Sequence, residues 1–569
     1  AREYPRFSTA VANAYVQPLI STYLKDAESL LEANGFRCPV LLMTSGGGLT
    51  DVYTAAALPA RLIESGPAGG VVLAENAARE LGAKRVLSLD VGGTTAKLCA
   101  VTDGRAAAAR EFEVDRAQGF KKHSGLPVHT PCLDLVEISG GGGSIASIDP
   151  LGGLLVGPDS AGSVPGPACY CRGGTAATIT DADVLLGRID TSAFAAGTVQ
   201  LRADAARRAI HDNVAVPQKR DSDYAAAHAI AEVVEETLAV AAKAHIAEHG
   251  DHAPLEDFVL IAFGGAAPLR ACSLAEKLGV QKVLIPPDAS VGSAIGFLSA
   301  PLAFEVTRVR LMRLDEASFA PCVVNEIYRA LWHETVSVIA AAAARWKPGR
   351  PAKERRCAYV RYVGQGHELP ISLPDRDVEP GDAQLLRSQF EQVAEQQAFV
   401  IPGAPMEVVT WSLGLVADSD PVAWTRERLR QHRPALGGAD ATLFPHGSPC
   451  ATRRLYDADT GRCDNVPVFR REDLSPGQLI KGPAVIAENY TSTVVLKTFQ
   501  AIALQTGFLQ LVRRSDSQPS IAPPLAPAKG SAGHSAMLFW RRLQAAAQEQ
   551  ADLLMRLAFS PVAREAGGG

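Results

Sequence analysis

The chain has 569 residues, of which 21% are charged, with a formal net charge of −5 and a pI of about 6.2. This length allows roughly two to four domains, and the slightly acidic balance does not favour nucleic acid or an anionic membrane surface as a partner. No apolar run reaches the ~18 residues that a membrane span needs, and no stretch resembles the core of a secretory signal. We therefore expect a cytoplasmic protein whose ten cysteines are reduced thiols.

The first half of the chain alternates predicted helices with short apolar strands. Apolar residues at three- and four-residue steps predict helices, and short apolar runs bounded by glycine predict buried strands. The helices are predicted at 10–34, 64–81, 204–212 and 223–249, and the strands at 39–44, 85–90, 97–101, 258–263 and 282–285. Such alternation is typical of an α/β fold.

The pattern changes after about residue 305. A helix is predicted at 326–346, antiparallel strands within 356–373 and 406–417, and a small all-β unit at 479–511. Residues 515–535 are rich in Pro, Ser, Ala and Gly, which predicts a flexible linker. An amphipathic helix is predicted to follow at 537–559.

The strongest local motif is Asp90-Val91-Gly92-Gly93-Thr94-Thr95, which follows the buried strand at 85–90. Two glycines let backbone N–H groups approach phosphate oxygens closely, and the two threonines add hydroxyl donors. A carboxylate at the strand end suits Mg²⁺. The alternative is an ordinary tight hairpin with an aspartate cap.

A second motif, Gly264-Gly265-Ala266, lies between a predicted strand and a predicted helix. Such a turn can place backbone against an adenosine or a phosphate, although many α/β proteins contain one without that role. The two motifs together indicate an actin-like (ribonuclease H-like) ATPase fold, in which two halves close on one nucleotide. That arrangement needs a further phosphate hairpin, and none precedes residue 90, so we interpret the N-terminal lobe as missing.

Six motifs in fixed order give a more specific resemblance. They are IESGPAGG (63–70), DVGGTTAK (90–97), SGLPVHTPCLDLVEISGGGGS (124–144), GPDSAGSVPGPACY (157–170), TDADVLLGRID (180–190) and FGGAAPL (263–269). They resemble the hydantoinase A family, which includes ATP-dependent hydantoinase and 5-oxoprolinase subunits and relatives in acetone and acetophenone carboxylases. RYVGQGHEL (361–369) and GPAVIAENYTSTVV (482–495) resemble the family's C-terminal region.

The resemblance implies a domain order. Residues 1–305 would form the actin-like ATPase domain, residues 306–514 a C-terminal β-rich domain, and residues 515–535 a linker. Residues 536–569 resemble the opening helix of the hydantoinase B partner, which suggests an A–B fusion truncated at both ends.

Three departures limit what the resemblance transfers. Lys97 replaces a family carboxylate and could contact phosphate directly, or be a solvated lysine. The family's Asp-x-His or Asp-x-Asn step is missing at Asp134–Glu137; these two carboxylates could share a metal or only cap and pack. Ala267 and Arg270 replace a Gly and a His. The first two departures point away from a strict 5-oxoprolinase, towards the N-methylhydantoinase or carboxylase branch.

Other polar residues have equally ordinary interpretations. Asp181 and Asp183 could position Mg²⁺ or cap the helix that follows them. His123, His129 and His367 are single histidines in turn-rich segments, where structural hydrogen bonding is the commoner role.

The function implied is ATP-dependent hydrolysis of a cyclic amide, of the hydantoin, N-methylhydantoin or 5-oxoproline type, through phosphorylation of the carbonyl oxygen. Asp90 and Lys97 would be catalytic, and Asp90 would hold Mg²⁺. Phosphate would be bound at Gly92, Gly93, Thr94, Thr95, Gly264, Gly265 and Ala266. A B-like half or subunit would complete a homo- or hetero-oligomer. The alternatives are a ketone carboxylase subunit and an inactive nucleotide-binding fragment.

Overall fold

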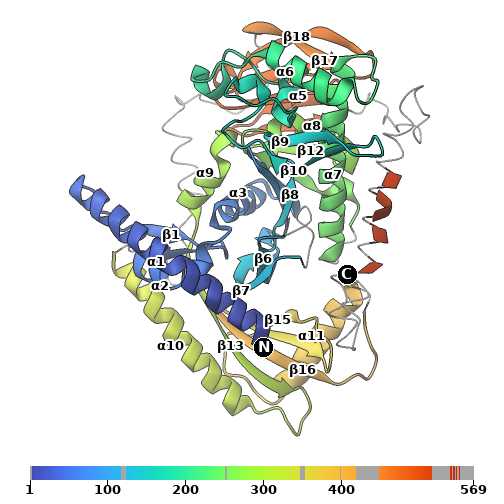
Figure 1. The fold of residues 1–569 in the computed structure, drawn as a ribbon. Helices are drawn as coiled ribbons and strands as arrows, with labels where there is room; N and C mark the ends of the chain where they lie inside the picture. Colours follow the sequence, from blue (N-terminus) through green and yellow to red (C-terminus); the bar gives the residue numbers. More distant parts are fainter. Residues whose placement is uncertain are drawn as a thin grey trace.

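The computed structural model describes residues 3–116, 124–249, 253–345, 353–397, 399–417 and 448–514, and parts of a helix between 539 and 551. They form two large mixed α/β regions, one above the other in Figure 1, with a smaller β-sheet at the top. The α/β class predicted from the sequence is confirmed. Within the described ranges, no helix combines the length and the apolarity that crossing a membrane requires.

A nine-stranded sheet forms the centre of the upper region. Its middle strands are β3 (Arg85–Val91), β4 (Thr95–Thr102), β11 (Val259–Phe263) and β12 (Lys282–Ile285). β11 runs parallel to both β3 and β12, whereas β3 and β4 form an antiparallel hairpin. The outer strands are β5 (Arg105–Ala106), β8 (Val136–Ser139), β19 (Leu479–Lys481), β22 (Phe499–Ala503) and β23 (Leu509–Arg513).

Helices cover both faces of this sheet (Figure 1). α3 (Ser65–Leu81) packs with α9 (Gly292–Ser299) on one side, and α7 (Asp223–Glu248) packs with α8 (Ala267–Leu278) on the other. Coverage on both sides explains why β3 is an almost continuous apolar run, with Val86, Leu87 and Leu89 fully buried. α3 and α9 approach so closely that a Cβ on Gly296 would lie 1.7 Å from the carbonyl oxygen of Gly69.

A six-stranded sheet forms the lower region, in the order β1-β2-β13-β16-β14-β15. Its strands are β1 (Leu41–Met43), β2 (Leu49–Asp51), β13 (Leu302–Arg313), β14 (Lys353–Tyr362), β15 (Leu369–Leu373) and β16 (Met406–Ala417). α10 (Pro321–Arg345) and α11 (Asp382–Gln396) pack against it. Its separate apolar core includes the fully buried Trp411, Tyr328 and Phe390.

The C-terminal strands divide between two sheets. β17 (Ala451–Asp457), β18 (Arg462–Arg470), β20 (Ala484–Ala487) and β21 (Ser492–Val495) form the four-stranded sheet at the top of Figure 1. β19, β22 and β23 return to the nine-stranded sheet, where β23 pairs with β12. The segment expected as a small all-β unit at 479–511 is therefore shared between both sheets. The domain boundaries proposed from the sequence stay a prediction.

The remaining helices and hairpins lie around these sheets. They are α1 (Glu3–Ala33), α2 (Val52–Ala57), α5 (Ile179–Leu185), α6 (Ala203–Ile210), the hairpin of β6 (Ala108–Val114) with β7 (Leu126–Leu133), and the hairpin of β9 (Ser144–Ile148) with β10 (Leu154–Ser160). Short helical turns lie at Pro59–Leu62, Ala168–Tyr170, Phe194–Gly197, His211–Ala215, Leu255–Asp257, Ala289–Val291 and Arg471–Asp473.

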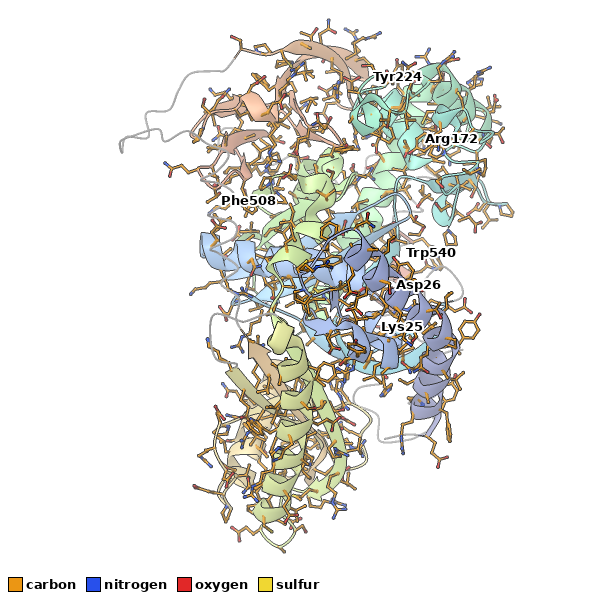
Figure 2. The ribbon with its side chains drawn as sticks, turned by 90° about the vertical axis from the view of Figure 1, so that its left-hand side faces the viewer. Lys25, Asp26, Arg172, Tyr224, Phe508 and Trp540 are labelled. Atoms are coloured by element: carbon orange, nitrogen blue, oxygen red, sulfur yellow. The ribbon has the colours of Figure 1, made fainter. Side chains whose placement is uncertain are left out.

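The C-terminal helical residues lie beside α7 in Figure 1. Arg542 forms an ion pair with Glu236 of α7 through its Nε atom. Phe539 and Trp540 are 68% and 57% exposed, and Trp540 is labelled in Figure 2. The predicted linker at 515–535 falls outside the described residues.

Candidate functional site

The hairpin between β3 and β4 is the centre of the candidate site. As the sequence predicts, the two strands pair in antiparallel register, with Asp90 opposite Lys97. The amide of Gly92 donates to the carbonyl of Thr95 at 3.1 Å, which closes the turn. Gly93 and Thr94 are exposed at its tip. This exposed tip is the part of the hairpin that an anionic ligand can approach.

The second predicted glycine turn lies directly beside this hairpin. β11 runs parallel to β3 with Phe263 level with Asp90, so the turn after β11 meets the end of β3. Gly264 has φ +89°, and a Cβ there would lie 2.5 Å from Oδ1 of Asp90. The amide of Ala266 donates to the carbonyl of Val91 at 3.0 Å. Two motifs about 170 residues apart in the chain thus form one surface, at the carboxyl ends of adjacent parallel strands.

A third glycine segment, Gly140–Gly143, supports the hairpin from the other side. The amides of Gly142 and Gly143 donate to the carbonyls of Gly92 and Gly93 at 3.0 and 2.6 Å. A Cβ on Gly141 would lie 2.3 Å from the carbonyl carbon of Thr94, so only glycine allows this approach. In the sequence these glycines appear only as the end of the 124–144 motif, and the run of four glycines is the signal that could have identified their role.

Asp90 is held in place by a residue that the sequence analysis missed. Ser293, at the start of α9, donates its hydroxyl to Oδ2 of Asp90 at 2.8 Å. Burial raises the pKa of Asp90 above its ordinary value, while the Ser293 hydrogen bond and the charge of Lys97 act in the opposite direction. A single serine 203 residues along the chain offers no local signal of this contact.

Lys97 and Glu137 face each other across the β4–β8 pair. Nζ of Lys97 lies 3.0 Å from Oε1 of Glu137 and 2.5 Å from Oγ1 of Thr95. Lys97 is thus placed beside the hairpin, but its charge already has a carboxylate partner. The predicted metal role of Glu137 competes with this ion pair.

Glu64 is a second residue that the sequence analysis missed. It precedes α3 with φ +64°. This left-handed conformation is energetically unfavourable for any residue other than glycine. Among the described residues its side chain makes no capping hydrogen bond to α3. Burial and then the charge of Glu137 raise the pKa of Glu64, opposed by Lys97 and Arg116. The charges of Glu137, Lys97 and Arg116 therefore act on Glu64.

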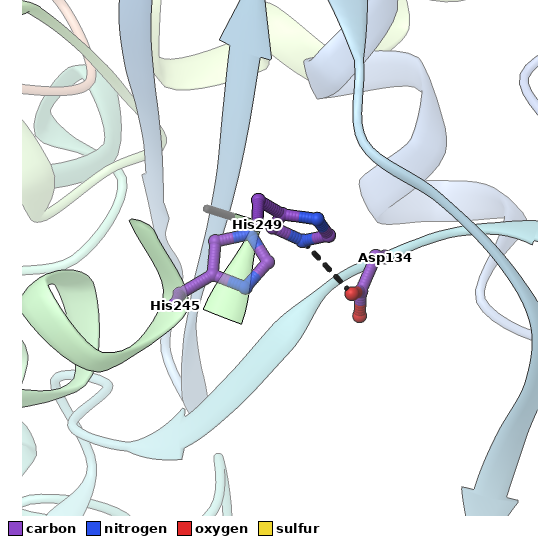
Figure 3. A group of neighbouring side chains, drawn as sticks. All are labelled: Asp134, His245 and His249. Atoms are coloured by element: carbon purple, nitrogen blue, oxygen red, sulfur yellow. Dashed lines mark ion pairs between the residues drawn. The ribbon is translucent and has the colours of Figure 1, made fainter. Parts of the chain in front are cut away.

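Asp134 lies away from Glu137, in a cluster with His245 and His249 (Figure 3). Oδ2 of Asp134 is 3.0 Å from Nε2 of His249, and one candidate ligand atom from each residue lies within 4.8 Å of the others. Two histidines one helical turn apart and a carboxylate are typical zinc ligands. However, Nε2 of His245 accepts the amide hydrogen of Ala100 at 3.2 Å. A neutral imidazole that accepts at one nitrogen carries its proton on the other.

The proton of a neutral His245 is therefore on Nδ1, which then offers no lone pair to a metal. This arrangement favours a hydrogen-bonded cluster that fastens the end of α7 to β4 and to the loop before β8. The structure does not bring Asp134 and Glu137 together as a shared metal site, because each carboxylate has a different partner.

The two aspartates of the TDAD motif have structural partners. Asp181 accepts hydrogen bonds from the amides of Thr178 and Cys169 and completes a capping box at the start of α5. Asp183 forms an ion pair with the fully buried Arg270, 2.6 Å from its Nη2. Arg270 thus anchors α8 to α5 behind the glycine turn. Of the three single histidines, His129 pairs with Glu111, and His123 falls outside the described residues.

A pocket opens beside Gly265. Its walls come from the segment after α5, from the start of α8, and from the loop between β20 and β21. The hydroxyl of Thr491 donates to the carbonyl of Gly265 at 2.9 Å, and Arg453 pairs with Asp190 at 2.9 Å. The C-terminal sheet therefore forms one side of the candidate site, which the sequence analysis did not foresee.

The family model described as hydantoinase/oxoprolinase matches residues 6–306. The chain belongs to this family. The predicted family resemblance is thus confirmed, and with it the expectation of an ATP-dependent enzyme family that includes amidohydrolases.

Several relatives of this hydantoinase/oxoprolinase family member match most of its length. An uncharacterized protein of Methanocaldococcus jannaschii is 32% identical, over 90% of this chain and 71% of its own. The caprolactamase subunit alpha of Pseudomonas jessenii is 29% identical, over 87% of this chain and 68% of its own. The acetophenone carboxylase gamma subunit of Aromatoleum aromaticum is 29% identical, over 91% of this chain and 68% of its own.

A solved structure supports the same assignment. The ATP-dependent caprolactamase of Pseudomonas jessenii superposes with a TM-score of 0.74 at 26% identity, over 90% of this chain and 71% of that one. The actin-like fold predicted from the sequence is confirmed. Two of the relatives are named as subunits, so family members work in multi-subunit enzymes.

Proposed function

We propose that this chain binds Mg·ATP at its three glycine turns and is the ATP-using part of an enzyme that activates a carbonyl group. The observation that carries this proposal is the junction of the β3–β4 hairpin with the Gly264 turn. Gly264 packs against the Asp90 carboxylate, and Ala266 is hydrogen bonded to Val91. An ordinary tight hairpin does not need a second glycine turn at its side.

The phosphate groups would lie over the exposed backbone of Gly93, Thr94 and Gly265. Among the described residues, nothing lies within 4 Å of a Cβ built on Gly93 or Gly265, so a ligand can approach both. Asp90 would hold Mg²⁺ directly or through water, since a carboxylate is a preferred ligand of this ion. Ser293 fixes one oxygen of Asp90 and leaves the other beside Gly264. The adenosine would enter the pocket beside Gly265 and Thr491.

The favoured reaction is hydrolysis of a cyclic amide. The carbonyl oxygen of the amide attacks the γ-phosphorus, and the bond to the bridging oxygen breaks with its electron pair leaving on ADP. Water then adds to the carbon that bears the phosphorylated oxygen, and the ring C–N bond breaks as the ring nitrogen takes up a proton. A second water cleaves the acyl phosphate that remains, which releases phosphate and the ring-opened acid. The protein's contribution is positioning and charge neutralisation. The likeness to a caprolactamase supports this choice.

A second candidate is carboxylation of a ketone, in which the enolate oxygen is phosphorylated by ATP. Water then cleaves the P–O bond, phosphate leaves, and the released enolate carbon forms a C–C bond to carbon dioxide derived from bicarbonate. The likeness to the acetophenone carboxylase gamma subunit favours it. Both candidates use the same ATP site and differ in the second substrate. In either case we propose a B-like half or subunit as the partner that supplies much of the substrate chemistry.

Phosphate release by the complete enzyme distinguishes the two reactions. Cyclic amides such as N-methylhydantoin, 5-oxoproline and caprolactam are tested without bicarbonate, and ketones such as acetone and acetophenone with and without it. Release with a cyclic amide and no bicarbonate supports the hydrolase. Release that depends on bicarbonate and a ketone supports the carboxylase, and release in neither condition contradicts both.

A further inference from the structure

Arg270, which replaces a histidine of the family motif, belongs to a buried group of four charged side chains. It is fully buried, and its Nη2 atom lies 2.6 Å from Oδ2 of Asp183, which is also buried. Nη1 of Arg188 lies 3.3 Å from Oδ1 of Asp183 and 3.1 Å from Oε1 of Glu235. Two positive and two negative side chains thus balance one another in the interior.

Stability alone does not account for these buried charges. Transfer of charges out of water is costly, and a well-packed apolar pair is often as stable as a buried ion pair. Nη1 of Arg270 adds to the cost, because it has no hydrogen-bond partner among the described residues. What the pair provides beyond stability is a fixed geometry, since a planar guanidinium binds a carboxylate over a narrow range of positions.

One end of the pair holds the second glycine turn. Arg270 lies in α8, which begins directly after that turn. Its Nε atom donates to the carbonyl of Ala266, the last residue of the turn, at 3.4 Å. Because Gly264 of the same turn packs against Asp90, a movement of α8 would also move the turn relative to the Asp90 carboxylate.

The other end of the pair supports the β3–β4 hairpin. Asp183 lies in α5, and in the first turn of α5 the amide and the hydroxyl of Thr180 both donate to the carbonyl of Gly142 at 2.8 Å. The amide of Gly142 donates in turn to the carbonyl of Gly92 in the hairpin, at 3.0 Å. The position of α5 therefore determines the position of the hairpin through two short hydrogen-bonded steps.

Arg188 connects the same group of charges to the pocket beside Gly265. Its carbonyl accepts a hydrogen bond from Nη1 of Arg453 at 3.3 Å, and Arg453 lines that pocket. The buried charges therefore contact the supports of the hairpin, of the second glycine turn and of the pocket wall. These are the three elements that we propose to bind different parts of one ATP molecule.

We infer that the Arg270–Asp183 ion pair is a positioning element of the ATP site, which sets the spacing between the two glycine turns that receive the phosphates. This inference rests on the proposed ATP-binding function and deepens it. Both side chains are buried, so each acts through the element that it holds and not through contact with the nucleotide. Phosphate oxygens must meet the groups of both turns at once, so a small change in spacing weakens binding.

The test compares ATP affinity with stability in the complete enzyme. Arg270→Met/Asp183→Asn removes one positive and one negative charge, keeps the approximate size of both side chains, and leaves Arg188 paired with Glu235. The Kd for Mg·ATP, measured by calorimetry, should rise at least about tenfold, because both turns can no longer contact the phosphates in the right geometry. The melting temperature should stay within a few degrees of the wild type, since the remaining charges are still balanced.

The matched control removes a comparable ion pair from the six-stranded sheet. Nη2 of Arg361 in β14 lies 2.8 Å from Oε1 of Glu407 in β16, and Glu407 is buried. Arg361→Met/Glu407→Gln should leave the Kd for Mg·ATP unchanged, because neither residue contacts a glycine turn. Arg270→Lys is the second variant: it keeps the charge but binds the carboxylate through a single ammonium group. Its Kd should lie between those of the wild type and of Arg270→Met/Asp183→Asn.

A folded Arg270→Met/Asp183→Asn enzyme that binds Mg·ATP as tightly as the wild type would overturn the inference. A lower melting temperature with unchanged ATP affinity would overturn it too, and would show that the pair only stabilises the fold. If the double variant does not fold, unchanged affinity in Arg270→Lys has the same consequence. A wild-type enzyme that does not bind Mg·ATP would contradict the proposed function itself, which distinguishes that failure from the others.

Discussion

The two large sheets of this protein differ in what surrounds them: a regular apolar core in one, and glycine turns with buried charges in the other. The six-stranded sheet is a regular packed unit, in which the fully buried Trp411, Tyr328 and Phe390 fill the space under α10 and α11. The nine-stranded sheet brings three glycine segments together and buries charges near them, such as Asp90 and the Arg270–Asp183 pair. Gly264 has a positive φ that glycine adopts without strain, and this lets it pack against Asp90. Close backbone packing and buried charge thus occur together where we propose that ATP binds.

If this contrast is correct, Trp411→Ala should change stability and leave nucleotide binding alone. Trp411 is fully buried and donates its indole N–H to the carbonyl of Arg310 at 3.0 Å. Its loss should lower the free energy of unfolding by about 3–5 kcal/mol, because a large cavity remains. Denaturant unfolding measures the loss, and titration of ATP into the folded variant checks the affinity. Trp332→Ala, at a site that is 40% exposed, is the control and should cost much less.

Asp90→Asn should lower the activity without lowering the stability. The rate of phosphate release should fall by about 100-fold or more, in the range seen when a group that stabilises developing charge is removed. Burial raises the pKa of Asp90, so the folded state binds the proton more tightly than the unfolded state. Ionised Asp90 therefore reduces stability above the unfolded pKa, and this penalty disappears at lower pH.

The Asn variant should accordingly be at least as stable as the wild type at pH 7. Its advantage should shrink as the pH falls through the ordinary range of an aspartate. Thermal unfolding between pH 3 and pH 8 is the measurement. A large loss of stability at pH 7 would show that Asp90 is mainly a structural residue.

Substitutions at the two neighbouring glycines of the second turn should have effects smaller than those of the preceding variants, and each serves as the control for the other. Gly264→Ala places a Cβ against Asp90 in a left-handed conformation, so we expect a loss of about 1–2 kcal/mol of stability and at least tenfold weaker ATP binding. Gly265→Ala meets nothing within 4 Å among the described residues and should affect stability little. Equal effects of the two variants would contradict the close packing of Gly264 on Asp90.

Glu64→Gln should change the stability least among these variants. Burial and the charge of Glu137 raise the pKa of Glu64, so the ionised form reduces stability at neutral pH. Glutamine removes the charge and keeps the backbone conformation. The melting temperature should therefore rise slightly at pH 7, and the difference should vanish below the ordinary pKa of a glutamate. A lower melting temperature at pH 7 would mean that attraction to Lys97 and Arg116 outweighs burial.

Local motifs predicted the parts of the site that depend on backbone chemistry. The hairpin after β3 and the Gly264 turn could be predicted because glycine after a buried apolar run is a strong signal of a turn. Ser293, Glu64 and the wall formed by Thr491 could not, because each reaches the site through contacts between residues far apart in the chain. Their closeness in sequence suggests that Asp134 and Glu137 could share a metal, but Asp134 precedes β8 and pairs with His249, whereas Glu137 lies in β8 and pairs with Lys97.

The fold shows the same division. Helix and strand positions followed from periodicity, including α7, α8 and β11. The pairing of β23 with β12 could not be predicted, since the sequence of an apolar strand does not indicate which other strand it pairs with. The pairing of β13 with β16 is a similar case.

The most direct test of the central claim is calorimetric titration of ATP into the complete enzyme, with Mg²⁺ and with a chelator, for the wild type and for Asp90→Asn. If Asp90 holds the metal of Mg·ATP, Mg²⁺ should strengthen ATP binding to the wild type at least tenfold, which is about 1.4 kcal/mol. The same comparison in Asp90→Asn should show little or no effect of Mg²⁺. No ATP binding by the wild type, or the same Mg²⁺ dependence in both proteins, would contradict the claim.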